Sequence, residues 1–488
     1  MKNPSLCASS LFFAAFSTFA DVRPAVVFSD RMVLQRDIAA PVFGQADPGE
    51  AVTVSFAGAS VSGTADAKGR WSVKLPPQKV NASPQQMTIA GKNRIVIDDV
   101  LVGDVWLCSG QSNMEMSLGG CNAPDDIATA SFPTLRRIKF PQISLRSPAD
   151  TVPGHWDTCT PASAGNFTAV GFYFARRIQR EVPGVPIGLL DDNWGGTRIE
   201  PWIPPVGFEQ QPALAKELAE VKARQSEPGD HPANERLDPG RPCAIYNGMI
   251  HPIVPFALKG ALWYQGESNG GEGESYYHKM HALVGGWRKI WGQGDFPFYF
   301  VQLANFQKAT DNPEGGDGWA RVRDAQTKSL DIPHTGMATI IDIGDGPDIH
   351  PKNKFDVGER LARWALKNDY GRADTVVSGP LFTSQKIEDG KIRLTFDHTG
   401  SGLIVGRKDG RKPTESVAGG KLQRFAIAGE DKKWAWADAI IDGSSVVVSS
   451  PAVPKPVAVR YAWSMNPDGA NLYNREGLPA VPFRTDNW

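Results

Sequence analysis

The spacing of apolar and polar residues changes twice along the chain and divides it into three regions. Between residues 22 and 97, apolar residues tend to recur at every second position between closely spaced turns such as Asp47-Pro48-Gly49. This alternation is typical of antiparallel strands that bury one face. The sequence therefore predicts an N-terminal β-sandwich-like domain over residues 21–99.

Five apolar runs follow, and segments of helical periodicity separate them. The runs lie near residues 102–107, 186–190, 258–264, 297–303 and 336–342. Apolar residues recur every three or four positions, as in amphipathic helices, over 168–181, 276–291, 319–329 and 354–368. Strands that alternate with helices favour a parallel sheet with both faces covered. We therefore expect an α/β domain over residues 100–373.

Two other regions differ from this alternation of strands and helices. A polar stretch at about 204–245 contains a predicted surface helix near 212–225 and a loop rich in proline and glycine. We interpret it as an insertion at the rim of a functional site. Short alternating segments return over residues 374–488 and predict a C-terminal β domain.

The first 20 residues have the pattern of a secretory signal. A short apolar stretch follows Lys2, and Thr18 and Ala20 are small residues at the −3 and −1 positions before Asp21. The stretch is too short to cross a bilayer. We therefore expect cleavage after residue 20, a secreted or periplasmic protein, and no membrane insertion.

Export would permit disulfide bonds between the four cysteines that remain after cleavage. Of these, Cys108 lies in an apolar run and is expected to be a buried free thiol, whereas Cys121 and Cys159 are candidates for a bridge. The chain has no C-x-x-C motif, and His278 and His281 have no neighbouring ligand residues. We therefore expect neither a metal nor a cofactor.

The overall composition excludes one class of partner. The formal net charge is −1, with 41% hydrophobic and 22% charged residues. A nearly neutral chain has no electrostatic reason to bind nucleic acid. The composition indicates an ordinary globular protein with a large core, and it contains no signal for an oligomeric state.

Residues suited to catalysis follow four of the five apolar runs. They lie at 110–113, 192–198, 264–269 and 342–350. The carboxyl ends of parallel strands meet at one edge of a sheet, and ligands bind at that edge. We therefore expect these four segments to form one site.

The expected chemistry is acyl transfer by a serine. Ser112 is the candidate nucleophile, and a serine hydroxyl needs a general base within hydrogen-bond reach. His350 is the candidate base, because imidazole titrates near neutral pH. Asp348 is the nearest acid in sequence that could orient the imidazole, and Asp345 and Glu267 are rivals. Glu267 is expected instead to be a buried acid that holds the loops together.

Other residues of the four segments could stabilise the oxyanion or bind substrate. Expected oxyanion donors are the backbone N–H groups of Ser112 and of Gly195 or Gly196, together with the Gln265 carboxamide. Trp194 and Trp202 could stack on a sugar, and Arg198 could pair with a substrate carboxylate or with a loop acid such as Glu200. Ser112 could alternatively serve only as a helix N-cap.

The motifs GQSN (110–113), GGT (195–197), QGES (265–268) and DIHP (348–351) occur in this order. Together they resemble the motif blocks of SGNH-type esterases of the sialate O-acetylesterase kind, over roughly residues 100–370. The resemblance implies a three-layer α/β/α SGNH (flavodoxin-like) hydrolase domain, here with flanking antiparallel β-sandwich domains. It also implies hydrolysis of acetyl esters on sugar hydroxyls without a metal.

The resemblance assigns roles to individual positions. It makes Ser112 the nucleophile and His350 the base, and it places Gly195 or Gly196 with Gln265 in the oxyanion blocks. The wider superfamily has its acid three residues before the histidine, where this chain has Pro347. It also has a G-x-N-D block where this chain has Gln265-Gly266-Glu267, so Asn269 is a second possible polar contact to substrate.

These observations predict an esterase that removes O-acetyl groups from a sugar or glycan through an acetyl-enzyme. The resemblance favours sialate esters as the substrate, with acetylated xylan or xyloglucan as the alternative. A non-catalytic carbohydrate-binding protein with a degenerate central domain is the competing hypothesis.

Overall fold

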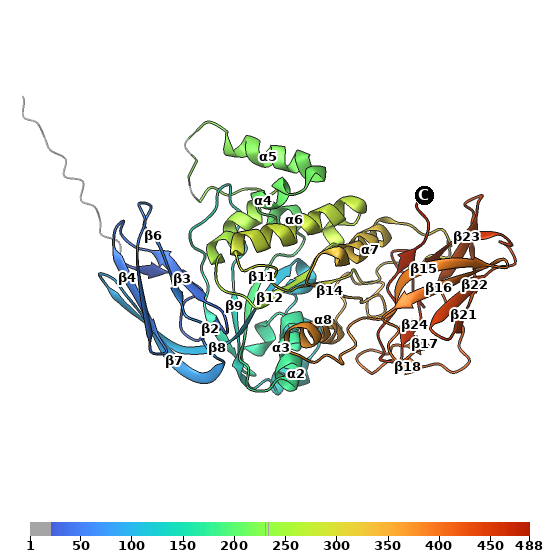
Figure 1. Cartoon of the computed structure of the whole chain (residues 1–488), viewed down its shortest axis with the longest axis horizontal. Helices are drawn as coiled ribbons and strands as arrows, with labels where there is room; N and C mark the ends of the chain where they lie inside the picture. Colours follow the sequence, from blue (N-terminus) through green and yellow to red (C-terminus); the bar gives the residue numbers. More distant parts are fainter. Residues whose placement is uncertain (1–20, 230, 233) are drawn as a thin grey trace, which may run out of the picture.

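The computed structural model describes residues 21–229, 231–232 and 234–488. The predicted signal sequence, residues 1–20, lies outside the described residues. Three regions follow one another along the long axis of the molecule: a β region, a central region that carries most of the helices, and a second β region (Figure 1). The mixed α/β class expected from the sequence is confirmed.

The central sheet contains a strand for each of the five predicted apolar runs. Its strand order is β10-β9-β11-β8-β12-β13-β14. All neighbouring pairs are parallel except β10 with β9. The bounds are β8 (Arg94–Gly110), β9 (Phe132–Lys139), β10 (Trp156–Cys159), β11 (Ile187–Asn193), β12 (Gly260–Tyr264), β13 (Phe298–Val301) and β14 (Thr335–Ala338).

Strand β9 was not predicted from the sequence, because its buried positions include charged residues. Arg136 and Arg137 are almost fully buried on β9. The Arg136 guanidinium pairs with Asp99 at 3.0 Å, and Arg137 Nε donates to Asp191 at 2.6 Å. Pairing of each guanidinium with a carboxylate allows burial that the charge alone would oppose, so the strand lacks an apolar signature.

Helices lie on both sides of the central sheet (Figure 1). On one side are α3 (Ala169–Glu181) and α8 (Lys354–Asp369), and on the other are α4 (Pro205–Glu209), α6 (Glu274–Trp291) and α7 (Gly318–Lys328). Successive residues of β12 pack into different cores, Leu262 and Tyr264 with the α3 and α8 side and Trp263 with the α6 side. The polar insertion supplies α4 and α5 (Ala215–Gln225); α4 packs against α6, and α5 packs against α4. Two short helices, α1 (Ser112–Glu115) and α2 (Pro124–Ala128), complete the region.

The N-terminal β region is continuous with the central sheet. It contains β1 (Arg23–Pro24), β2 (Val33–Gln35), β3 (Ala40–Gln45), β4 (Ala51–Phe56), β5 (Ala59–Thr64), β6 (Arg70–Leu75) and β7 (Asn81–Ala90). The first part of β8 pairs antiparallel with β7, and its last part pairs parallel with β11 and β12. The boundary predicted between residues 99 and 100 therefore falls inside one strand.

The C-terminal β region has its own hydrophobic core, which includes Ile392, Phe425 and Val446. Two four-stranded antiparallel sheets have the orders β15-β16-β22-β21 and β20-β19-β23-β25, and a small sheet has the order β18-β17-β24. The bounds are β15 (Leu381–Glu388), β16 (Lys391–Asp397), β17 (Leu403–Arg407), β18 (Glu415–Ser416), β19 (Phe425–Gly429), β20 (Trp434–Trp436), β21 (Asp438–Asp442), β22 (Ser445–Ser449), β23 (Pro456–Tyr461), β24 (Leu472–Asn474) and β25 (Phe483–Arg484).

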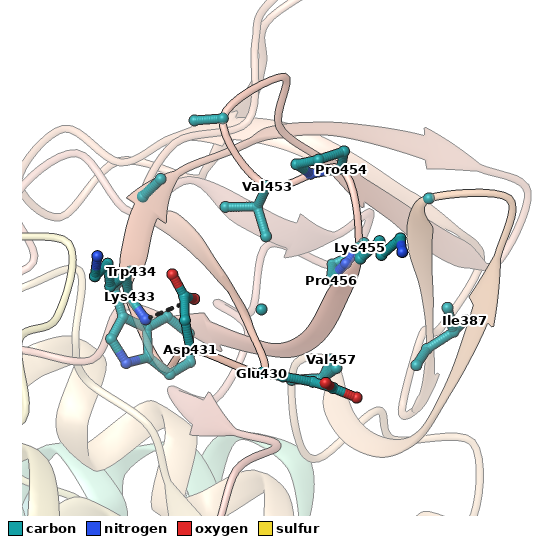
Figure 2. Close-up of a pocket in the computed structure, with 14 residues that line it drawn as sticks. Ile387, Glu430, Asp431, Lys433, Trp434, Val453, Pro454, Lys455, Pro456 and Val457 are labelled. Atoms are coloured by element: carbon teal, nitrogen blue, oxygen red, sulfur yellow. Dashed lines mark hydrogen bonds between the residues drawn. The ribbon is translucent and has the colours of Figure 1, made fainter.

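A cavity of about 740 Å³ opens in this C-terminal region (Figure 2). Its lining includes Ile387, Asp431, Trp434 and Val453. None of the residues that the sequence predicts for the functional site lines it. The size of this cavity is therefore no evidence that the chemistry takes place there.

The candidate disulfide between Cys121 and Cys159 was wrong. Cys108, Cys121, Cys159 and Cys243 are all free and buried. The Cys121 thiol donates a hydrogen bond to the Ser117 carbonyl at 3.3 Å, and Cys159 packs in the core beneath α3. No helix in the described part of the chain has the length and apolar character needed to cross a membrane.

Candidate active site

Ser112 lies on a tight turn between the carboxyl end of β8 and the short helix α1. Gly110 ends the strand with a φ of 135°, and a Cβ there would lie 2.2 Å from the Tyr264 carbonyl oxygen. Only glycine fits this close approach of two backbones. Gln111 occupies the N-cap position and Ser112 is the first helical residue. The N-cap interpretation of Ser112 was therefore wrong.

The Ser112 hydroxyl contacts the predicted base directly. Ser112 Oγ lies 2.8 Å from His350 Nε2. His350 comes from the loop between β14 and α8, and burial lowers its pKa, although the Asp348 carboxylate opposes this effect. A neutral imidazole at this distance can accept the serine proton.

Asp348 holds the base mainly through the backbone. Its Oδ1 accepts a hydrogen bond from the His350 backbone N–H at 2.8 Å, but the same oxygen lies 3.7 Å from His350 Nδ1. The backbone hydrogen bond from His350 also lowers the pKa of Asp348. The rival Asp345 is exposed, and Glu267 bonds to Asn113 instead. Asp348 is therefore the acid best placed to influence the imidazole, without a direct hydrogen bond to the ring.

This geometry predicts a modest effect for Asp348→Asn. We expect kcat on p-nitrophenyl acetate to fall about tenfold, far less than the ~10⁴-fold loss typical of a buried triad acid bonded to its histidine. Asp345→Asn is the matched control and should retain the wild-type rate. A loss near 10⁴-fold in Asp348→Asn would show that the carboxylate bonds to the ring during catalysis.

The two glycines that follow β11 differ in what their backbone N–H groups contact. The Gly195 N–H donates to Glu115 Oε2 at 2.6 Å. A Cβ on Gly195 would lie 3.2 Å from Ser112 Cβ, so this residue borders Ser112. Gly196 adopts a φ of 76°, and its N–H has no hydrogen-bond partner among the described residues. Of the two glycines, Gly196 has the amide open to an incoming oxygen.

A role for Glu115 in the site was not predicted from the sequence. It lies three residues after Ser112 on α1, a spacing that places two side chains on the same face of a helix. Its other carboxylate oxygen accepts a hydrogen bond from Gln142 Nε2 at 2.7 Å. Glu115 therefore anchors the Gly195 loop beside the serine.

Gln265 and Asn269 are hydrogen-bonded to each other and to neighbouring loop residues. Both are fully buried. Gln265 Nε2 donates to Asn269 Oδ1 at 2.7 Å and to the Thr197 carbonyl at 3.2 Å, which uses both of its N–H groups. Asn269 Nδ2 donates to Glu200 at 3.1 Å, and its oxygen also accepts from the Ile199 backbone N–H. The pair ties the loops after β11 and β12 together, and both N–H groups of Gln265 are engaged in doing so.

The three residues that the sequence predicts for substrate binding lie in different environments. Trp202 is completely buried and packs edge-on against Trp263, so its stacking on a sugar is excluded. Trp194 is only partly buried and packs against the core. Arg198 pairs with the carboxylates of Glu200 and Glu272, which confirms the alternative that it binds loop acids.

A second layer of hydrogen bonds supports the serine loop. Gln111 Oε1 accepts from the Ser268 backbone N–H at 3.2 Å, and Asn113 Nδ2 donates to Glu267 Oε1 at 2.6 Å. Burial raises the pKa of Glu267. The expectation that Glu267 holds the active-site loops is confirmed by this contact with the residue next to Ser112.

A serine hydroxyl bonded to an imidazole at the carboxyl edge of a mainly parallel sheet is the arrangement of the α/β serine hydrolases. Residues 102–367 match the family model described as carbohydrate esterase, sialic acid-specific acetylesterase. The chain belongs to this family and is a carboxylic ester hydrolase.

Individual relatives agree with this assignment over nearly the whole length. The sialate O-acetylesterase of Mus musculus is 30% identical, and the alignment covers 94% of this chain and 94% of the mouse protein. The Homo sapiens sialate O-acetylesterase is also 30% identical, over 94% of this chain and 92% of the human protein. The crystal structure of a carbohydrate acetylesterase from Xanthomonas citri is 41% identical, with a TM-score of 0.83 over 96% of this chain and 100% of that chain.

Proposed function

We propose that this protein is a carbohydrate O-acetylesterase in which Ser112 is the nucleophile and His350 the general base. The observation that carries the proposal is the 2.8 Å contact between Ser112 Oγ and His350 Nε2. It joins residues 238 positions apart in the sequence. A non-catalytic binding protein would have no need for this contact at the edge of the sheet.

The geometry supports a two-step mechanism. Ser112 Oγ attacks the acetyl carbonyl carbon while its proton moves to His350 Nε2, and the carbonyl oxygen becomes an oxyanion. The imidazolium then gives this proton to the sugar oxygen, so that the ester bond breaks and the sugar hydroxyl leaves. A water molecule, deprotonated by the same imidazole, attacks the acetyl-enzyme and releases acetate and Ser112.

Backbone amides supply the oxyanion donors in this proposal. Ser112 begins α1, so its N–H has no partner in the turn, and the Gly196 N–H is open as described above. Two such donors aimed at the developing charge are the usual device of acyl-transfer enzymes. We assign the donors to Ser112 and Gly196, and a loop-holding role to Gly195 and Gln265.

The strand order and the helices on both faces support a three-layer SGNH hydrolase domain, with antiparallel β-sandwich domains before and after it. We place this domain at residues 100–373, although β8 extends into the N-terminal region. The apolar stretch and the small residues before Asp21, within residues 1–20, support the proposal that the protein is exported.

O-acetylated sialate is the first candidate substrate class, because the relatives named above carry that activity in their names. Acetylated neutral sugars, such as those of xylan or xyloglucan, are the second. One observation favours this second class: the Arg198 guanidinium is already paired with Glu200 and Glu272. A sialate carboxylate would have to compete with both of these carboxylates for the guanidinium.

Acetate release from O-acetylated sialic acid and from acetylated xylan would separate the two classes. We expect the kcat/KM values for these two substrates to differ by at least tenfold. Arg198→Met is the informative variant: it should lose activity on the sialate ester alone if Arg198 binds the substrate carboxylate. Absence of release from every acetylated sugar, with a folded protein, would contradict the proposed function.

The pH profile provides an independent prediction. His350 must be neutral to accept the proton, and burial places its pKa below its ordinary value. We therefore expect kcat/KM to rise with pH through a midpoint below about 6.5 and then to level off in the neutral range. Asp348→Asn should move this midpoint lower, because the Asp348 carboxylate raises the His350 pKa. A midpoint well above 7 would contradict this account of the base.

A further inference from the structure

A buried lysine lies directly behind the serine and histidine. Lys354 is the first residue of α8 and is completely buried. Its Nζ donates to Asn113 Oδ1 at 2.5 Å and to the Pro351 carbonyl at 2.8 Å, and it lies 5.3 Å from the centre of the Tyr264 ring. No carboxylate in the described part of the chain forms an ion pair with it. A buried ammonium without a partner of opposite charge is costly, so its presence needs a reason.

Asn113 connects this lysine to both reacting residues. It follows Ser112 directly, and its Nδ2 donates to the Ile349 carbonyl at 3.0 Å as well as to Glu267. Ile349 and Pro351 flank His350 in the sequence. The carbonyl before His350 is therefore held by Asn113 and the carbonyl after it by Lys354, and these two side chains are hydrogen-bonded to each other.

The charge of Lys354 determines which way the Asn113 amide faces. An ammonium can only donate hydrogen bonds, so it must meet the oxygen end of the carboxamide. The nitrogen end then faces two acceptors, the Ile349 carbonyl and the Glu267 carboxylate. If the amide turned over, Nδ2 would meet the ammonium and Oδ1 would meet two acceptors.

We propose that Lys354 is a positioning residue that holds the His350 loop against the Ser112 loop through Asn113. This role rests on the proposed function, because it sets the contact through which Ser112 would lose its proton. The lysine touches neither the substrate nor the reacting atoms. It acts by keeping the separation between Ser112 Oγ and His350 Nε2 short enough for proton transfer.

The surroundings of Lys354 make this role sensitive to pH. The ionisable groups around it are Cys121, Glu267, Lys352 and Asp348, and burial lowers the Lys354 pKa to about 8. Below that pH the ammonium enforces the orientation of Asn113. Above it the neutral amine carries a lone pair and can also accept, so only the two acceptors at the nitrogen end still favour this orientation and kcat should decline.

The test is Lys354→Met, which keeps an unbranched side chain but removes the charge and the donors. We expect kcat on p-nitrophenyl acetate to fall by a factor on the order of 10², as for misplacement of a catalytic pair by about 1 Å. KM should stay within about twofold, because the lysine does not contact substrate. The decline of kcat above pH 8 should disappear, and Lys354→Arg should restore part of the rate.

Lys367→Met is the matched control, because Lys367 lies on the same helix and is exposed; its kcat and pH profile should equal those of the wild type. Thermal unfolding establishes that each variant is folded. If Lys354→Met does not fold, Asn113→Ala tests the same tether and should show the same loss of kcat at constant KM.

Wild-type kcat in a folded Lys354→Met, or in Asn113→Ala when that variant replaces it, would overturn the positioning role. So would a wild-type enzyme whose kcat does not decline above pH 8. If Ser112→Ala is inactive in the same assay, either result leaves the proposed function intact. An active Ser112→Ala would instead overturn the proposed function itself.

Discussion

Ser112→Ala is expected to lower kcat on p-nitrophenyl acetate by a factor on the order of 10⁶, the loss typical of a removed serine nucleophile. The reason is that the covalent acetyl-enzyme cannot form without the hydroxyl that bonds to His350 at 2.8 Å. Burst kinetics would give the clearest measurement, since the wild type should release one equivalent of p-nitrophenol rapidly if deacetylation is slower than acetylation.

Ser117→Ala is the matched control for this substitution. Ser117 follows α1 and is partly buried like Ser112, but its hydroxyl makes no hydrogen bond to His350. We expect its kcat to equal that of the wild type. Equal rates in Ser112→Ala and the wild type would exclude the serine mechanism, and inactivity of the wild type on all esters would favour the carbohydrate-binding alternative.

Arg323→Met is expected to have the largest effect on stability. Arg323 lies on α7, is completely buried, and donates four hydrogen bonds to backbone carbonyls; these belong to Leu303, Ala304, Ser464 and Met465. The first two carbonyls follow β13 and the last two belong to the C-terminal β region, so one guanidinium joins both. Burial lowers its pKa to about 10, and it remains charged at neutral pH.

The expected loss in the free energy of unfolding is about 3–5 kcal/mol, because methionine would leave buried carbonyls without donors. Urea denaturation followed by tryptophan fluorescence would measure it. Arg321→Met is the control: this neighbouring arginine is exposed and donates to the Gly316 carbonyl. The free energy of unfolding of Arg321→Met should stay within about 0.5 kcal/mol of the wild-type value. Similar losses in both variants would show that the buried hydrogen bonds of Arg323 are not decisive.

Local sequence patterns were sufficient for most of the elements of the central region and for the expectation that Ser112 and His350 lie together. Apolar runs predicted the strands that end at Gly110 and Tyr264 because buried parallel strands need continuous apolar residues. Ser112 and His350 could be paired in advance because loops that follow parallel strands meet at one edge of the sheet. Strand β9 escaped because its buried arginines are neutralised by carboxylates distant in the sequence, such as Asp191.

The partners of each polar side chain depended on the folded chain. Nothing in the sequence around Gln265 or Asn269 shows that their amides bond to each other, and nothing near Glu115 shows that it binds the Gly195 N–H. A carboxamide can serve as an oxyanion donor, a substrate contact or a loop tie, and a carboxylate can serve as a substrate contact or a loop tie, with the same neighbours in sequence. The choice depends on which donors and acceptors the fold brings within about 3 Å, and those come from distant segments of the chain.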